Sequence, residues 1–154
     1  MNEGMSAIVK TMSVLLIMPM TIFGMYVIIH GHLTPGGGFP GGAVMATMMA
    51  MLFVAFGAEK SKKFLGKGSL STIESLGLLA FAAVAFIGIQ ATFFSNFLAN
   101  SASYFGMSIS YGPNPGYLNS GGVLPLMNLA VGIEVFAAIT AIVLVMLTYR
   151  EEKS

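Results

Sequence analysis

Few residues in this chain could do chemistry, and the most informative is Glu134. It is the one ionisable residue well inside the long apolar segment 123–149. A charge near the centre of a bilayer costs about 2.5–3.5 kcal/mol on insertion scales, so this carboxylate must be protonated, paired or placed in a hydrated ion path. Gln90 is expected at a similar depth, and Thr21 and Thr47 could complete a polar patch between helices. Glu134 and Gln90 are therefore ion-pathway candidates, and a structural contact with a neighbouring protein is the alternative.

The other polar groups are better explained by structure than by chemistry. Ser71 and Glu74 have the S-x-x-E spacing of a helix capping box, which predicts a helix start at that point. His30 and His32 lack a third metal ligand nearby, so we expect them to face water and form hydrogen bonds at the outer membrane boundary. The chain contains no cysteine, no Ser–His–Asp set and no pair of catalytic carboxylates. We expect no catalytic residue, metal site or cofactor, and hence no autonomous enzyme.

Glycine and proline dominate the stretch GHLTPGGGFPGG, residues 31–42. Gly36, Gly38 and Gly41 fit the G-x-G-x-x-G dinucleotide fingerprint, but that motif has meaning only between a strand and a helix. The preceding segment 11–29 is too long and too continuously apolar to be a strand, which argues against a nucleotide site. Two interpretations remain open: a tight structural turn, or an irregular backbone segment that dips toward membrane depth.

The overall composition points to a membrane protein. Hydrophobic residues make up 56% of the chain and charged residues only 8%, whereas a soluble domain carries about 25% charged residues. The net charge of +1 gives no indication of nucleic-acid binding. The first apolar run is longer than the hydrophobic region of a signal peptide, so we expect it to remain in the mature protein.

The apolar segments predict an all-α membrane protein with four transmembrane helices in a single integral membrane domain, residues 1–154. A bilayer core of about 30 Å needs about 20 helical residues, and the second segment barely reaches that length. The expected spans are about 11–30, 42–58, 72–98 and 123–149.

The basic residues support the weak second span, because all seven then fall on one side of the membrane. By the positive-inside rule both termini are cytoplasmic, and the Gly/Pro-rich loop between the first two helices lies outside. We therefore expect a multi-pass protein of the cell membrane. The seven basic residues are Lys10, Lys60, Lys62, Lys63, Lys67, Arg150 and Lys153.

The glycine-rich stretch also carries a family resemblance. It resembles the H-x-x-P-G-G-G-F-x-G-G signature of the MrpB/MnhB family, which supplies one component of the Mrp/Mnh multisubunit Na⁺/H⁺ antiporters and has relatives in membrane-bound hydrogenases and their sulfur-reducing counterparts. The four-span layout extends the resemblance over nearly the whole chain, although the later spans match in layout more than in motif. The matching residues are His32, Pro35, Gly36, Gly37, Gly38, Phe39, Gly41 and Gly42.

The resemblance implies a small accessory membrane subunit without a cofactor of its own. Its expected partners are the other membrane subunits of an antiporter module, the lipid bilayer and, in a hydrogenase-type parent complex, a peripheral arm. Two alternatives remain: an independent homo-oligomeric ion channel or transporter, in which symmetry would form a ring of Glu134 side chains, and a purely structural scaffold.

Overall fold

The structure is a computed structural model of the chain. It describes residues 5–57, 60, 62–63, 65–89, 92–102, 104–109 and 116–152, with the side chains of 150–152 excepted. Within these residues the chain forms long helices and one short 3₁₀ turn, and no strand. The elements are α1 (Ala7–Ile29), α2 (Gly38–Phe56), α4 (Lys67–Ile87), η1 (Leu118–Ser120) and α5 (Leu124–Glu152).

The helices α1, α2, α4 and α5 are each long and apolar enough to cross a membrane. Their most apolar windows have mean hydropathies of 2.2, 1.8, 1.9 and 2.5. A helix satisfies its backbone hydrogen bonds internally, which is what a lipid-exposed segment requires. The prediction of an all-α protein with four membrane-spanning helices is confirmed within the described residues.

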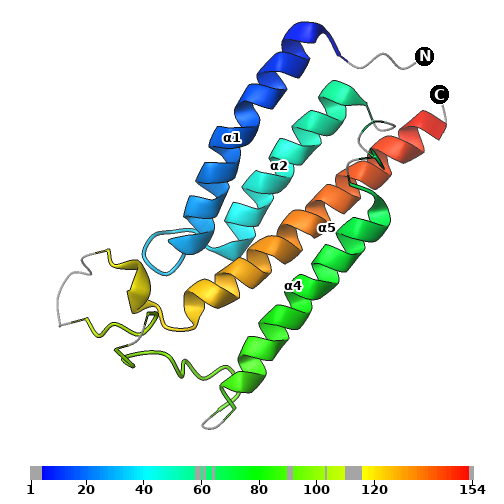
Figure 1. Cartoon of the computed structure of the whole chain (residues 1–154). Coiled ribbons are helices and arrows are strands. Elements are labelled where there is room, and N and C mark those ends of the chain that lie inside the picture. Colours follow the sequence, from blue (N-terminus) through cyan, green and yellow to red (C-terminus); the bar gives the residue numbers. More distant parts are fainter. Residues whose placement is uncertain are drawn as a thin grey trace.

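The four helices form a row rather than a square bundle. Figure 1 shows the order α1, α2, α5, α4 across the molecule, and extensive contacts join each helix to the next in that order, whereas α1 touches α5 only slightly. The two outer helices are only 17% buried over their apolar windows, compared with 39% for α2 and 33% for α5. The row therefore leaves much apolar surface on α1 and α4 for lipid or other proteins.

The start of α1, the end of α2, the start of α4 and the end of α5 lie on the same side of the molecule, at one end of the helix axes (Figure 1). The backbone N–H of Met5 donates to the Ala55 carbonyl at 3.0 Å, which ties the start of α1 to the end of α2. Lys10 and Lys67 belong to helix segments at this end. This placement agrees with the expected one-sided distribution of basic residues; which face of the membrane it occupies stays a prediction.

A buried apolar cluster holds α2, α4 and α5 together. Phe53 is 1% exposed, Leu70 is 0% exposed and Leu144 is 2% exposed, and each comes from a different helix. Full burial of such a side chain contributes about 1.5–3 kcal/mol. The cluster members are Met48, Met49, Phe53, Leu70, Ala137 and Leu144.

The expected start of the third span is wrong. Helix α4 begins at Lys67, its N-cap is Gly66, and no side chain caps it. Ser71 and Glu74 therefore lie inside the helix and form no capping box. The helix starts earlier because its first turn buries Leu70 in the apolar cluster, and tertiary packing of this kind overrides a local capping signal.

The expected end of the third span, at residue 98, is also wrong. Helix α4 ends at Ile87, and Gly88 is its C-cap. The chain then folds back on the helix end: the Phe94 N–H donates to the Ala85 carbonyl at 3.5 Å, and the rings of Phe86 and Phe93 meet edge-to-face at 5.1 Å. The apolar residues after Ile87 are thus used in local aromatic contacts rather than in a longer helix.

Asn96 anchors this folded-back segment to the start of α5. Its side-chain amide donates to the Gly121 carbonyl at 3.2 Å, and its Oδ1 accepts from the Val123 N–H at 2.8 Å. The second bond satisfies a backbone donor beside the first turn of α5, where intrahelical partners are missing.

Candidate functional site

The glycine-rich stretch is a short hairpin followed by the first turn of α2, not an outer loop over 31–42. Helix α1 ends at Ile29, and α2 already begins at Gly38. Gly37 takes φ 125°, which favours glycine, and its N–H donates to the Val27 carbonyl at 3.3 Å. Pro40 is tolerated because a first-turn residue needs no intrahelical N–H bond. The predicted loop over 31–42 is therefore too long, because its residues from Gly38 onward belong to α2.

The glycines of this first turn let three backbones approach one another. A Cβ on Gly41 would lie 2.7 Å from the Gly24 carbonyl oxygen of α1, and a Cβ on Gly42 would lie 2.6 Å from the Gly132 carbonyl oxygen of α5. Real Cβ atoms do not approach backbone atoms this closely. Gly38 likewise packs against α5, where a Cβ would lie 2.7 Å from the Val131 Cβ. The motif is a packing device that holds α2 between α1 and α5.

The expectation that His32 faces water is wrong. Both of its ring nitrogens are buried and have no hydrogen-bond partner. The imidazole packs against the chain before α5, where a Cβ on Gly121 would lie 2.8 Å from His32 Cδ2. His30, by contrast, stacks on Tyr26 with ring centroids 4.0 Å apart, and its Nδ1 lies 3.0 Å from the Tyr26 carbonyl oxygen.

The remaining motif residues lie on the surface of the chain. Phe39 is 64% exposed although it stands close to the buried glycines. Pro35 and Gly36 are exposed on the hairpin. The exposed ring of Phe39, beside the buried Gly37 and Gly38, is open to contact with lipid or with a neighbouring protein.

Glu134 lies near the middle of α5, about 15 Å along the helix axis from Leu124. Its side chain is partly buried and lies at the contact with α4: a Cβ on Gly77 would lie 3.0 Å from Glu134 Cβ and 2.9 Å from its backbone nitrogen. Within the described part of the chain, no hydrogen bond or ion pair reaches its carboxyl group. Glu134 therefore combines a position inside the apolar window of α5, partial burial and the absence of a described partner.

Thr21 and Thr47 form no described hydrogen bond with Glu134. Gln90 lies outside the described residues. The hydroxyl of Thr21 donates to the Ile17 carbonyl at 2.7 Å and lies 3.2 Å from Met48 Sδ, and that of Thr47 donates to the Val44 carbonyl at 2.7 Å.

Thr140 is a buried polar residue that the sequence analysis missed. It lies on α5, is 0% exposed, and its hydroxyl has no hydrogen-bond partner. The only signal in the sequence was its position as a polar residue within the same apolar segment as Glu134. In the part of the chain that is described, no group of three or more His, Cys, Asp or Glu residues could hold a metal ion.

Two relatives place this chain among known proteins. It is 33% identical over 122 residues to an uncharacterised protein of Methanocaldococcus jannaschii, a match that covers 79% of this chain and 44% of the relative. It is 36% identical over 53 residues to a Staphylococcus aureus protein named as antiporter subunit mnhB2, which covers 34% of this chain and 38% of the relative.

A solved structure shares the fold. A chain of the membrane-bound sulfane sulfur reductase, an archaeal respiratory membrane complex, superposes with a TM-score of 0.72 at 34% identity, covering 95% of this chain and 59% of that one. This chain thus spans 59% of the reductase chain and 44% of the archaeal relative. Residues 8–141 match the family described as a domain related to the MnhB subunit of Na⁺/H⁺ antiporters. With four membrane-spanning helices and a family match over most of its length, the chain is a multi-pass membrane protein and belongs to the MnhB-related family.

Proposed function

We propose that this chain is an accessory membrane subunit of a multisubunit cation (Na⁺)/proton antiporter module, where it packs neighbouring subunits and supports ion translocation. The observation that carries this proposal is Glu134, a partly buried carboxyl group at mid-membrane depth with no described partner. Intramembrane ionisable groups of this kind face a protein interface or a hydrated path, because exposure to lipid is costly.

The row of helices supports the role of a packing subunit. Large apolar side chains project from both outer helices, with Ile8 75% and Met18 71% exposed on α1 and Leu79 68% exposed on α4. The exposed Phe39 adds a bulky side chain beside the glycine contacts. Surfaces of this kind suit insertion between other membrane subunits, with lipid covering what the partners leave free.

Glu134 would act together with groups from a partner. A Na⁺ ion takes several oxygen ligands, and no described residue forms a hydrogen bond or ion pair with the Glu134 carboxyl group. The neighbouring subunit would supply the remaining oxygens or a basic residue, and Glu134 would pass an ion or proton between two half-channels. Both termini would lie in the cytoplasm, as the one-sided basic residues predict.

The proteins that co-purify with the chain would identify its parent complex. The experiment is affinity purification of the tagged chain after gentle solubilisation, followed by mass spectrometry of everything that co-purifies. Antiporter subunits alone would identify a stand-alone antiporter, and antiporter subunits with a Ni–Fe or Fe–S arm would identify a respiratory complex of the hydrogenase type. A homo-oligomer with no partners would contradict the proposal and favour an independent channel.

A further inference from the structure

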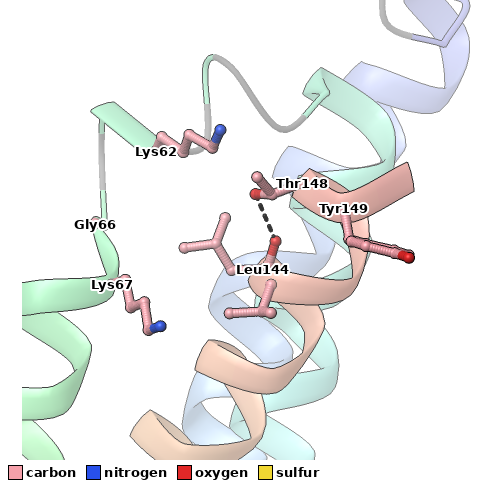
Figure 2. Close-up of a pocket in the computed structure, with 7 residues that line it drawn as sticks. Lys62, Gly66, Lys67, Leu144, Thr148 and Tyr149 are labelled. Carbon is pink, nitrogen blue, oxygen red and sulfur yellow. Dashed lines mark hydrogen bonds between the residues drawn. The ribbon is translucent and has the colours of Figure 1, made fainter. Parts of the chain in front are cut away.

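A cavity of about 480 Å³ opens between the start of α4 and the end of α5 (Figure 2). Its size falls within the ~300–1,000 Å³ of typical small-molecule sites. It lies at the same end of the helices as the start of α1 (Figure 1). Leu144 in its wall is ten residues after Glu134 on α5, about 15 Å further along the helix axis. The lining residues are Lys62, Gly66, Lys67, Leu144, Val145, Thr148 and Tyr149.

The cavity has an apolar wall and a basic wall. Leu144 and Val145 of α5 supply the apolar wall, while Lys62 and Lys67 extend toward it from the opposite side (Figure 2). Among the described residues neither lysine forms an ion pair. The Thr148 hydroxyl donates to the Leu144 carbonyl at 2.9 Å, so its oxygen can still accept a hydrogen bond from a ligand hydroxyl.

The position of the cavity along the helices indicates which class of ligand it would bind. It lies where α4 begins and where the apolar window of α5 ends at Tyr149. With these helices across a bilayer, this level would coincide with the head-group region. Phospholipid phosphates lie at this depth, and basic pockets between transmembrane helices bind anionic head groups. An apolar wall on the membrane side would contact the glycerol and upper acyl chain, and a soluble anion would leave that wall unused.

We propose that this cavity binds an anionic phospholipid, with the phosphate between Lys62 and Lys67 and the upper acyl region against Leu144 and Val145. The bound lipid would join the start of α4 to the end of α5, on the side of the molecule that carries the basic residues. This site is separate from the proposed ion pathway and does not depend on it.

The experiment is native mass spectrometry of the full chain in detergent with added phosphatidylglycerol, phosphatidylcholine or glycerol phosphate. Two lysines near a phosphate should give roughly a tenfold preference for phosphatidylglycerol over phosphatidylcholine. The double variant Lys62→Gln with Lys67→Gln should lose this preference. The matched control, Lys60→Gln with Lys63→Gln, removes the same charge from exposed residues outside the cavity and should keep it.

A second variant blocks the cavity without changing the lysines, so that loss of lipid binding does not depend on one pair of substitutions. Val145→Trp places a bulky ring in the cavity from the 44% exposed surface of α5 and leaves both lysines unchanged. It should also lose the phosphatidylglycerol adduct. Equal binding of phosphatidylcholine, equal binding of glycerol phosphate, or an unchanged adduct in both cavity variants would overturn the proposal.

Discussion

Gly77 of α4 lies directly against Glu134 of α5, so closely that a Cβ on the glycine would be 3.0 Å from Glu134 Cβ. The same Cβ would lie 3.0 Å from the Ala130 carbonyl oxygen, one turn earlier in α5. The absence of a side chain at Gly77 therefore sets the separation of the two helices at the depth of the intramembrane carboxyl group. Gly77 and Glu134, which are far apart in the sequence, thus form one helix–helix contact.

Substituting Gly77 by alanine should destabilise the α4–α5 contact. The added methyl group meets backbone atoms that cannot move aside, and overpacking of this kind costs about 1–3 kcal/mol. The measurement is the midpoint of thermal unfolding in detergent, which should fall. Gly68→Ala is the matched control on the same helix, because nothing lies within 4 Å of a Cβ there; it should raise stability by up to about 1 kcal/mol through helix propensity. Equal effects of the two substitutions would contradict the packing role.

Substituting Gly42 by alanine should loosen α2 from α5. The new Cβ would lie 2.6 Å from the Gly132 carbonyl oxygen and 3.0 Å from Val135 Cβ. The measurement is distance broadening between spin labels on the exposed ends of α2 and α5, with the midpoint of thermal unfolding as a second readout. A native distance distribution in Gly42→Ala would show that the motif glycine is not needed for close packing.

Replacing Phe39 by alanine should leave the fold intact and weaken assembly. The ring is 64% exposed, so its loss removes little contact within the chain. We expect an unchanged thermal midpoint for the isolated chain and reduced recovery of partner subunits in affinity purification, measured by quantitative mass spectrometry. Full partner recovery would assign the ring to lipid rather than to a protein interface.

Replacing His32 by leucine should preserve or raise stability. Both ring nitrogens are buried without partners, and such unsatisfied groups cost about 1–3 kcal/mol each. An apolar side chain of similar size removes that cost while filling the space beside Gly121. Thermal unfolding of the His32→Leu variant checks this, and a marked fall in the midpoint would mean that the imidazole is hydrogen-bonded by water or a neighbouring subunit.

The sequence was sufficient to predict an all-α chain with four helices of membrane-spanning length, because the length of an apolar segment is a property of the chain itself. It also predicted that the basic residues lie at one end of these helices, and Lys10 and Lys67 do so. It predicted the boundaries of α4 incorrectly. Leu70 extends the helix start through contacts with distant residues, and Phe93 and Phe94 turn back on the helix instead of lengthening it. Such contacts depend on the tertiary arrangement, which local patterns do not record.

The glycine motif illustrates the same limit at the candidate site. The sequence indicated that Gly41 and Gly42 permit unusual backbone geometry, but not that their missing side chains face Gly24 and Gly132 on two other helices. The burial of His32 depends equally on Gly121, which is remote in sequence. Glu134 was found from sequence because a charged residue in a long apolar segment is conspicuous without any knowledge of its neighbours.

A role of Glu134 in ion translocation is tested by measuring Na⁺-coupled proton transport in vesicles that contain the assembled complex. Glu134→Gln keeps the size of the side chain and removes its charge, so transport should fall strongly while partner recovery is unchanged. Glu151→Gln is the control on the same helix, beyond its apolar window, and should transport normally. Normal transport by an assembled Glu134→Gln complex would contradict a role of Glu134 in translocation and leave the chain a structural scaffold.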